Sequence, residues 1–216
     1  MDQIADAIRI GEVARGDRLP AERALAERMG VSRPTLREAI GVLARAGVVE
    51  VLPGPAGGTF VISDVIPASL AEGTVSRLAA IPAVLQARRA FEPAVAQLAA
   101  VHAGKDDLAA LERVVNAQRA VVNDWARITQ LDNRFHHEMA RATRNPVIVS
   151  MMTSLSRELE IARATRVAND GAAERAVSVN AETLEAIRSG DRERIEVVMD
   201  HHLSLLERAW EDAGRG

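Results

Sequence analysis

Three side chains in the second half of the chain could together hold a divalent metal ion. Asp132 and His136 are four residues apart, which places them on one face of a helix, and His202 follows on a later segment. One carboxylate and two imidazoles suit a borderline ion such as Zn²⁺ or Ni²⁺. Spacing alone is a weak signal, because an Asp and a His four residues apart on a helix are more often an ordinary surface pair.

A second set of side chains, near the N-terminus, could contact DNA. Arg33 and Arg37 are four residues apart, and the planar guanidinium group matches the O6 and N7 atoms of guanine. Ser32 and Thr35 suit phosphate oxygens, and Arg23 is a further candidate upstream. Since the formal net charge is −3, contact with DNA must depend on such a local patch of arginines rather than on bulk attraction.

These DNA-contacting candidates fall on a pattern typical of a winged helix-turn-helix. One short helix is predicted over about residues 21–28, and a second runs from Ser32, a good N-cap, to about Ala46. Gly30 between them can take the left-handed conformation that ends a helix. Two strands, at about residues 48–51 and 59–61, flank a Gly/Pro-rich tip. Such an element lays its second helix in a DNA groove.

The remaining two thirds of the chain are predicted to be helical. Pro, Gly and Asn breaks, such as Ile81-Pro82, separate helices expected at about residues 67–79, 82–103, 106–122, 124–143, 146–167, 172–189 and 192–212. A short amphipathic helix is also expected within residues 1–13. The fold class is therefore mainly α, with a winged helix-turn-helix domain at 1–62, a linker at 63–67 and an all-helical bundle at 68–216.

Composition excludes several classes of protein. The 216 residues include no Cys, so disulfide frameworks and thiolate metal sites are excluded. With no apolar run of membrane-spanning length and no signal-peptide pattern, we expect a soluble, cytoplasmic protein without a membrane partner. Aromatic residues make up only 2% of the chain, which argues against stacking platforms for single-stranded nucleic acid.

The N-terminal motifs resemble the winged-helix domain of the GntR family of bacterial transcription regulators. The resemblance is carried in order by LPAERALAERMGVSRPTLREAI, LARAGVVEV and GGTFV. It implies that the DNA contacts fall on Arg23, Ser32, Arg33, Thr35 and Arg37, with Gly57 near the wing tip. Two positions depart from the family: Ala21 replaces a capping Ser, and the tip lacks a basic or polar side chain, so we expect the wing to contact DNA through its backbone. The first helix is also short for the family, so the true start codon could lie upstream.

The C-terminal motifs resemble the FCD ligand-binding domain, which defines one branch of this family. The segments are RRAFEPAVAQLAA, LDNRFHHEMARATRNP and EAIRSGDRERIEVVMDHHL. The resemblance implies a helical bundle that binds a small effector, often a carboxylic acid, and in many members a metal held by one Asp and three His.

Three of the four metal positions match, at Asp132, His136 and His202, whereas the fourth is Asn180. Because an amide oxygen is a poorer ligand than imidazole, the site is weaker, completed by water or effector, or lost. The alternative is a polar pocket in which the same four residues bind the effector directly. Arg88 matches an arginine that often pairs with an effector carboxylate, although Glu92, four residues on, could be its partner instead.

The sequence therefore predicts a cytoplasmic, homodimeric, effector-responsive regulator of double-stranded operator DNA, with a repressor favoured over an activator. Dimerisation is expected because two recognition helices read two half-sites. Two rival functions stay open. One is a metal-dependent hydrolase using Asp132, His136 and His202, and the other is a winged-helix adaptor for protein partners.

Overall fold

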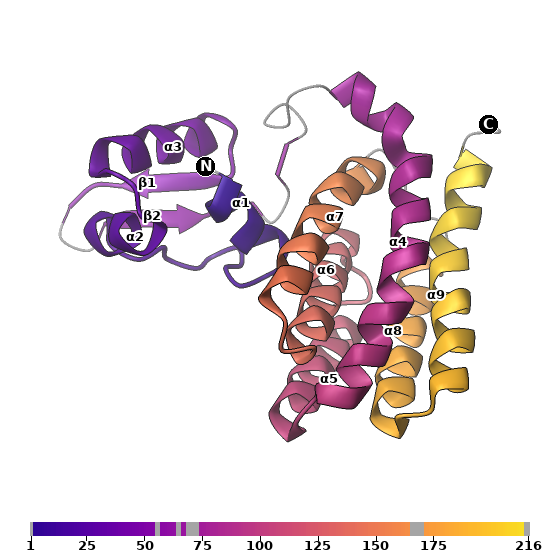
Figure 1. The fold of residues 1–216 in the computed structure, drawn as a ribbon. Helices are drawn as coiled ribbons and strands as arrows, with labels where there is room; N and C mark the ends of the chain where they lie inside the picture. Colours follow the sequence, from indigo (N-terminus) through magenta and orange to yellow (C-terminus); the bar gives the residue numbers. More distant parts are fainter. Residues whose placement is uncertain (1, 55–56, 64–65, 68–73, 165–170, 214–216) are drawn as a thin grey trace. The chain divides into compact units, whose positions relative to one another are not determined.

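The chain folds into two compact units, residues 1–74 and 75–216. The computed structural model describes residues 2–54, 57–63, 66–67, 74–164 and 171–213 (Figure 1). Each unit has its own apolar core, and each is described by itself below.

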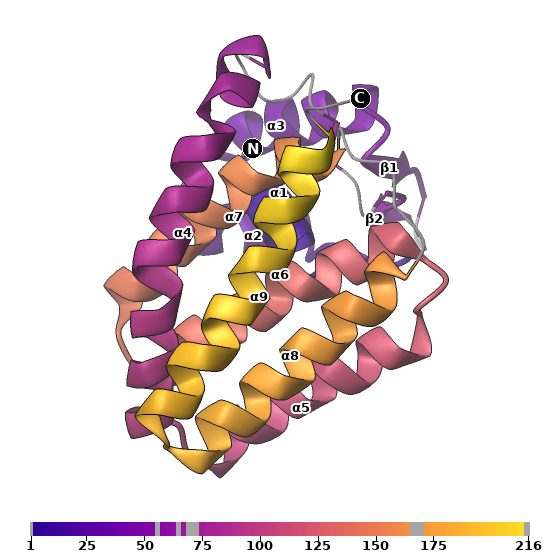
Figure 2. The same ribbon diagram turned by 90° about the vertical axis from the view of Figure 1, so that its right-hand side faces the viewer.

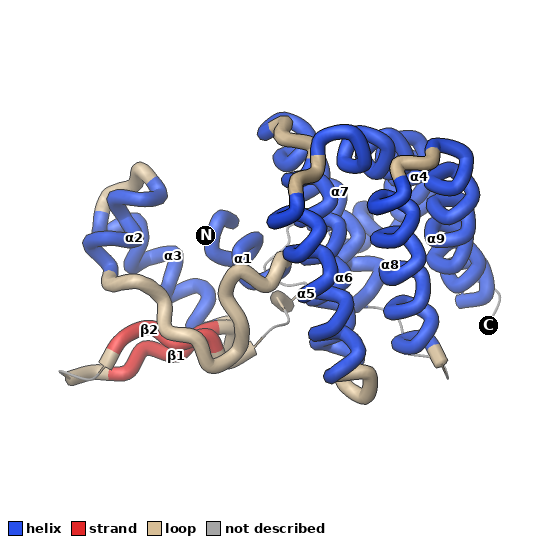
Figure 3. Tube along the Cα trace, turned by 90° about the horizontal axis from the view of Figure 1, so that it is seen from below, coloured by secondary structure: helices blue, strands red, loops and turns tan. Residues whose placement is uncertain are grey.

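The N-terminal unit is a winged helix-turn-helix. It contains α1 (Asp2–Arg9), α2 (Glu22–Met29), α3 (Arg33–Arg45), β1 (Val49–Leu52) and β2 (Gly58–Val61). The two strands pair antiparallel, with Val49 opposite Val61 and Leu52 opposite Gly58, and Figure 3 shows them as a single hairpin. The predicted two helices and two-stranded wing are confirmed, whereas α1 ends earlier than the predicted 1–13.

Local signals explain how α2 and α3 are joined. Gly30 has φ 65° and ψ 30°, and its N–H donates to the carbonyl groups of Ala26 and Glu27, which closes α2. Ser32 then caps α3, because its Oγ accepts from the backbone N–H of Thr35 at 3.2 Å. The inner face of α3 contributes Leu36, Ile40 and Leu43 to the core of the unit, and this packing fixes which face of α3 remains exposed.

The C-terminal unit is a bundle of helices. Its members in the described residues are α4 (Thr74–His102), α5 (Lys105–Ala120), α6 (Trp125–Ala142), α7 (Pro146–Ala164), α8 (Ala172–Ser189) and α9 (Arg192–Ala213). Figure 2 shows α4, α9 and α8 from one side, with α5 and α6 behind them. The core is centred on α6, where Phe135, Met139 and Ala140 are fully or almost fully buried. Across the described residues, no helix is long and apolar enough to cross a membrane.

One predicted helix break is wrong. The sequence predicts separate helices at 67–79 and 82–103, but α4 runs without interruption from Thr74 to His102 with Pro82 and Pro93 inside it. A proline in a helix interior removes one amide hydrogen bond. Beside Pro82, Ile81 and Leu85 are buried in an apolar cluster with Leu159, and this packing offsets the lost hydrogen bond. Residues 68–73 of the predicted first helix, and 165–167 of the predicted 146–167 helix, lie outside the described residues.

Candidate DNA-binding surface and buried polar cluster

The N-terminal end of α3 presents the predicted DNA-contacting side chains to solvent. Ser32, Arg33, Thr35 and Arg37 are all exposed. The hydroxyl groups of Ser32 and Thr35 lie 2.7 Å apart, and Ser32 Oγ also accepts from the backbone N–H of Thr35. Such an exposed, positively polarised helix start is suited to phosphate oxygens.

Arg33 and Arg37 of α3 turn toward one acidic side chain on α2. Arg37 Nε donates to Glu22 Oε2 at 2.8 Å, and Arg33 Nη2 lies 3.7 Å from the same oxygen. The predicted contact residue Arg23 instead forms an exposed pair with Glu27 at 3.5 Å. Ala21 makes no side-chain cap, which agrees with the departure seen in the sequence. The arginines are therefore held at the surface by exposed contacts that can rearrange.

Gly57, the predicted wing residue, is buried at the base of the wing tip. A side chain there would overlap the carbonyl oxygen of Leu52, so this position requires glycine. Arg18 donates from Nη2 to the Gly57 carbonyl, and its guanidinium lies 5.9 Å from the centre of the Phe60 ring. Arg18 thus fixes the base of the wing to the segment that precedes α2.

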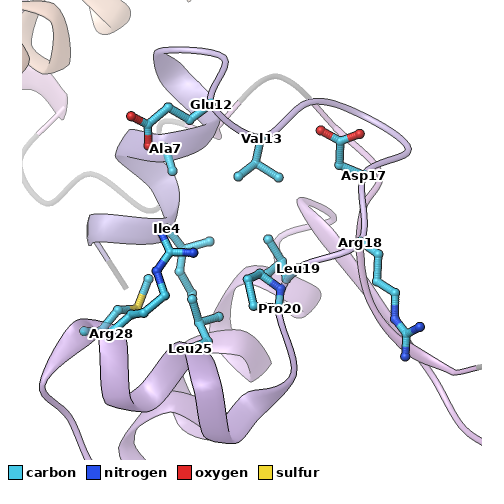
Figure 4. A pocket seen from close by; sticks show the side chains of 11 residues that line it. Ile4, Ala7, Glu12, Val13, Asp17, Arg18, Leu19, Pro20, Leu25 and Arg28 are labelled. Carbon is cyan, nitrogen blue, oxygen red and sulfur yellow. The ribbon is translucent and has the colours of Figure 1, made fainter.

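A hollow of about 380 Å³ lies between α1, the following loop and α2 (Figure 4). Its lining combines apolar side chains such as Ile4 and Leu25 with the charged Glu12 and Arg28. Figure 4 shows the Arg18 side chain directed away from this hollow. None of the predicted site residues lines it.

The helical unit contains a buried group of polar side chains, here called the polar cluster. Four helices contribute to it, and its members are Arg88 and Glu92 of α4, Asp132 and His136 of α6, Asn180 and Thr183 of α8, and His202 of α9. Each of these side chains is at most 9% exposed. The structure therefore brings together every residue that the sequence predicted for the effector and the metal.

Arg88 and Glu92 form the charged centre of the polar cluster. Arg88 Nη2 donates to Glu92 Oε2 at 2.9 Å, and its Nε donates to the other carboxylate oxygen at 2.5 Å. Burial alone would lower the pKa of Arg88, but the nearby carboxylates, Glu92 foremost, together raise that pKa. Burial alone would raise the pKa of Glu92, but Arg88 outweighs it and lowers that pKa. Both groups are therefore charged, and Glu92 is the Arg88 partner that the sequence offered as an alternative.

Hydrogen bonds fix the tautomers of the two histidines. Arg88 Nη2 lies 2.7 Å from His136 Nε2, while Glu92 Oε2 lies farther from that nitrogen, at 3.3 Å. Because arginine can only donate, the shorter contact makes Nε2 an acceptor. His136 Nδ1 then donates to the carbonyl of Asp132 at 3.1 Å. Thr183 gives its own proton to the Val179 carbonyl, so its Oγ1 accepts from His202 Nδ1 at 3.1 Å. The Nε2 atom of His202 thus carries a lone pair for a ligand, whereas the Nε2 lone pair of His136 already accepts from Arg88.

His202 is neutral in this environment. Burial is the largest cause of this, and it lowers the pKa of His202 to about 3. The two imidazole rings pack edge to face with centroids 5.0 Å apart. A neutral imidazole is the form that binds metals.

Asn180 occupies the fourth position of the candidate metal site and acts as a donor. Its Nδ2 donates to Asp132 Oδ1 at 3.0 Å and to Gln118 Oε1 at 3.1 Å. Asn180 Oδ1 and Gln118 Nε2 are buried, and neither has a hydrogen-bond partner among the described residues. An unpaired acceptor and an unpaired donor at one buried place are suited to a polar ligand group or water.

The donor set fits a divalent ion at three positions out of four. One ligand atom from each of Asp132, His136 and His202 lies within 4.8 Å of the others, and the tautomers of both histidines are those of metal ligands. Asn180 supplies an amide in place of the third imidazole, and its N–H group already occupies one Asp132 oxygen.

Sequence reasoning missed four residues that the structure adds to these sites, namely Arg18, Glu22, Gln118 and Thr183. Glu22 lies within the DNA-binding motif and Arg18 directly precedes it, but their partners come from other elements, so the sequence did not indicate these contacts. Gln118 lies on α5 and carried no motif signal at all.

A winged helix with exposed arginines, followed by a helical domain with a buried polar cluster, is the arrangement of a DNA-binding transcription regulator. Residues 1–61 match the bacterial regulatory proteins of the gntR family, and residues 83–205 match the FCD domain. The chain belongs to the FCD-domain branch of the GntR family.

Relatives of known structure or function agree with this assignment. The chain is 26% identical to the HTH-type transcriptional repressor NanR of Salmonella newport, over 99% of this chain and 85% of that protein. It is similar to Streptococcus agalactiae GntR with a TM-score of 0.52 and 26% identity, over 96% and 97% of the two chains. The fold of E. coli McbR/YncC is also similar, with a TM-score of 0.55 and 18% identity over 97% and 95% of the two chains.

These findings decide between the alternatives left open by the sequence. The family and its relatives are transcription regulators, so the chain is a DNA-binding regulator and not an enzyme. The hydrolase and adaptor interpretations are therefore wrong.

Proposed function

We propose that this regulator is a cytoplasmic, homodimeric repressor that binds double-stranded operator DNA and releases it when a small effector binds the helical domain, with the domain border at residues 63–67. The observation that carries DNA contact is the capped start of α3, where Arg33, Thr35 and Arg37 are exposed while the opposite face is buried. Repression is supported by the repressor NanR, which aligns over 99% of the chain. A dimer supplies the two recognition helices that a two-fold operator requires.

On this proposal, each part of the N-terminal surface has a distinct role. Arg33 and Arg37 read base edges in the major groove. Ser32 and Thr35 contact phosphate, with Arg23 released from its exposed pair to join them. Because the tip sequence LPGPAGG carries no basic or polar side chain, the wing contacts DNA through its main chain.

A footprint of the promoter region upstream of its own gene and its neighbours tests this function. We expect protection of two half-sites related by a two-fold axis, spaced by about one helical turn or a multiple of it. The logarithm of the binding constant should fall steeply with the logarithm of salt concentration, because phosphate contacts release counterions. A flat salt dependence would contradict DNA as the partner.

The polar cluster is the effector site on this proposal, and the effector is a carboxylic acid. Arg88 Nη1 makes no hydrogen bond among the described residues, so its N–H groups remain available to a carboxylate. The unpaired Asn180 Oδ1 and Gln118 Nε2 offer further polar contacts. The effector must bind the repressing and released placements of the DNA-binding domains unequally, since otherwise it could not change operator affinity.

Asp132, His136 and His202 would hold a divalent ion such as Zn²⁺ or Ni²⁺ at this site. When bound, the ion would offset the buried negative charge of Asp132 and attract an effector carboxylate. A thermal-shift screen of carboxylic acids, with and without Zn²⁺ or Ni²⁺, tests both points on protein purified without a His tag. The effector should raise the Tm of the protein and also weaken its binding to the operator. An acid that raises the Tm without weakening operator binding would not be the effector.

A further inference from the structure

Glu22 occupies a position between the two arginines proposed to read the operator. It is the first residue of α2, and its Oε2 accepts from Arg37 Nε at 2.8 Å and lies 3.7 Å from Arg33 Nη2. One oxygen of a side chain that is 34% exposed thus contacts two guanidinium groups that are 56% and 62% exposed. Arg37 and Glu22 lie 15 positions apart in the sequence and on different helices. Their hydrogen bond is therefore a tertiary contact rather than an i, i+4 pair within one helix.

The geometry at Arg37 leaves its base-reading edge free. Glu22 takes the Nε–H of Arg37, whereas Nη1 and Nη2 at the end of the guanidinium make no hydrogen bond among the described residues. The two terminal nitrogens are the edge that can match guanine O6 and N7 together. A carboxylate that holds Nε therefore orients the guanidinium without blocking its recognition of a base.

We propose that Glu22 is a specificity-determining residue that positions Arg37 and Arg33 for base reading and keeps them off the phosphates of non-cognate DNA. The inference rests on the proposed function. On a cognate site, Arg37 keeps its Nε contact and reads guanine with its terminal nitrogens. On other sequences, an arginine that moves to a phosphate leaves the Glu22 carboxylate unpaired beside the DNA backbone, where like charge repels it.

The simpler role for Glu22 is at the start of α2. An acidic residue in the first turn stabilises a helix through the macrodipole, and that role needs only the charge. Positioning needs both the charge and the length of the side chain, because an aspartate one methylene shorter does not reach the arginines from the same backbone position. Glu22→Asp therefore separates the two roles, and Glu22→Gln removes the charge while it keeps the length.

The experiment compares wild-type protein with Glu22→Gln, Glu22→Asp and Glu38→Gln. Glu38 is exposed on α3 itself, so Glu38→Gln removes the same charge near the same surface without touching the contact. The probes are a duplex that wild-type protein selects from a randomised pool and a shuffled duplex of the same composition. Affinity for both is measured over a range of salt concentrations, and circular dichroism checks the fold of each variant.

We expect both Glu22 variants to lower the ratio of selected to shuffled affinity by about tenfold, the scale of one bidentate base contact. For Glu22→Gln, binding to the shuffled duplex should strengthen and its log–log salt slope should steepen by about one, because a released arginine reaches a phosphate. Glu38→Gln should keep the wild-type ratio.

Three results would overturn the inference alone: an unchanged ratio in Glu22→Gln, a wild-type ratio in Glu22→Asp, or an equal loss in Glu38→Gln. If wild-type protein selects no sequence from the pool, the proposed function fails and takes this inference with it.

Discussion

Arg88 and His136 meet in the interior of the helical domain, where Arg88 Nη2 lies 2.7 Å from His136 Nε2. The same Nε2 lone pair would bind a metal ion, and one lone pair cannot serve both a proton donor and an ion. An ion at this site would therefore displace Arg88 from His136 and leave an additional Arg88 N–H group for an effector carboxylate. On the proposed function, metal and effector would be linked through this contact, because occupation of His136 would change the donors that Arg88 offers.

The Arg88–Glu92 pair should be important for the stability of the helical domain. Both side chains are at most 2% exposed, so Glu92→Gln leaves a buried guanidinium without a counter-charge at bonding distance. We expect a loss of about 3 kcal/mol or more in the free energy of unfolding of this domain. Urea denaturation followed by circular dichroism measures it, and Arg88→Met combined with Glu92→Leu should recover most of the loss.

An exposed pair in the same domain is the matched control. Arg192 and Glu196 have the same i, i+4 spacing at 3.8 Å, but their side chains are 79% and 56% exposed. Arg192→Gln should change the free energy of unfolding by less than about 1 kcal/mol. Equal losses in Glu92→Gln and Arg192→Gln would show that burial adds nothing to the Arg88–Glu92 pair.

The operator affinity should depend on Arg37. Arg37→Ala removes a side chain that is 62% exposed, so the fold is expected to persist while operator affinity falls by about tenfold or more. Fluorescence anisotropy with the selected duplex measures the change. Arg113→Ala removes the same charge from an exposed position of α5 and should leave affinity unchanged. Wild-type affinity in Arg37→Ala would rule out the assignment of α3 to the groove.

Arg18 should affect DNA binding without contacting a base. Its bond to the Gly57 carbonyl and its position over the Phe60 ring hold the wing against the segment before α2. Arg18→Met keeps much of the side-chain volume but removes the donor, so we expect a loss of about 1 kcal/mol in stability and a several-fold weaker operator affinity. The stability and operator affinity of Arg18→Lys should lie between those of wild type and Arg18→Met, because an ammonium group can still donate to the Gly57 carbonyl. Unchanged affinity in Arg18→Met would show that the wing position does not matter for binding.

Local signals made the helix-turn-helix predictable. Gly30 ends α2 by its left-handed conformation, and Ser32 begins α3 by capping its first turn. Both effects involve residues close in the chain, so one sequence is enough to predict where these helices end and begin. The continuous α4 was not predictable in this way. The cost of Pro82 is local, but the compensating burial of Ile81 and Leu85 against Leu159 depends on a helix more than seventy residues away.

Residue type and spacing offered Asp132, His136 and His202 as candidates, and the resemblance to a family added Arg88 and Asn180, but the bonding within the polar cluster was not predictable at all. Asp132 and His136 share a helix face, yet spacing could not show that Arg88 donates to His136 or that Asn180 donates to Asp132. These contacts join α4 to α6 and α8 to α6. The direction of each hydrogen bond follows from which atom can donate a proton. The bonds themselves depend on where the fold places α4, α6 and α8, which spacing along the chain does not show.

A third imidazole at position 180 should strengthen metal binding. Asn180 Nδ2 now donates to Asp132 Oδ1, so the amide both fails to supply a nitrogen ligand and occupies an oxygen that an ion would use. Asn180→His removes that donor and completes a set of one carboxylate and three imidazoles, which suits Zn²⁺ or Ni²⁺ better than a set with an amide. Competition with a chelator, on protein purified without a His tag, should show tighter binding than wild type. Asn180→Leu, which releases Asp132 without adding a ligand, is the control, and an equal gain there would assign the effect to Asp132. If Asp132→Ala in the Asn180→His background retained its full metal content, the ion would be bound elsewhere and the assignment of this site would fail.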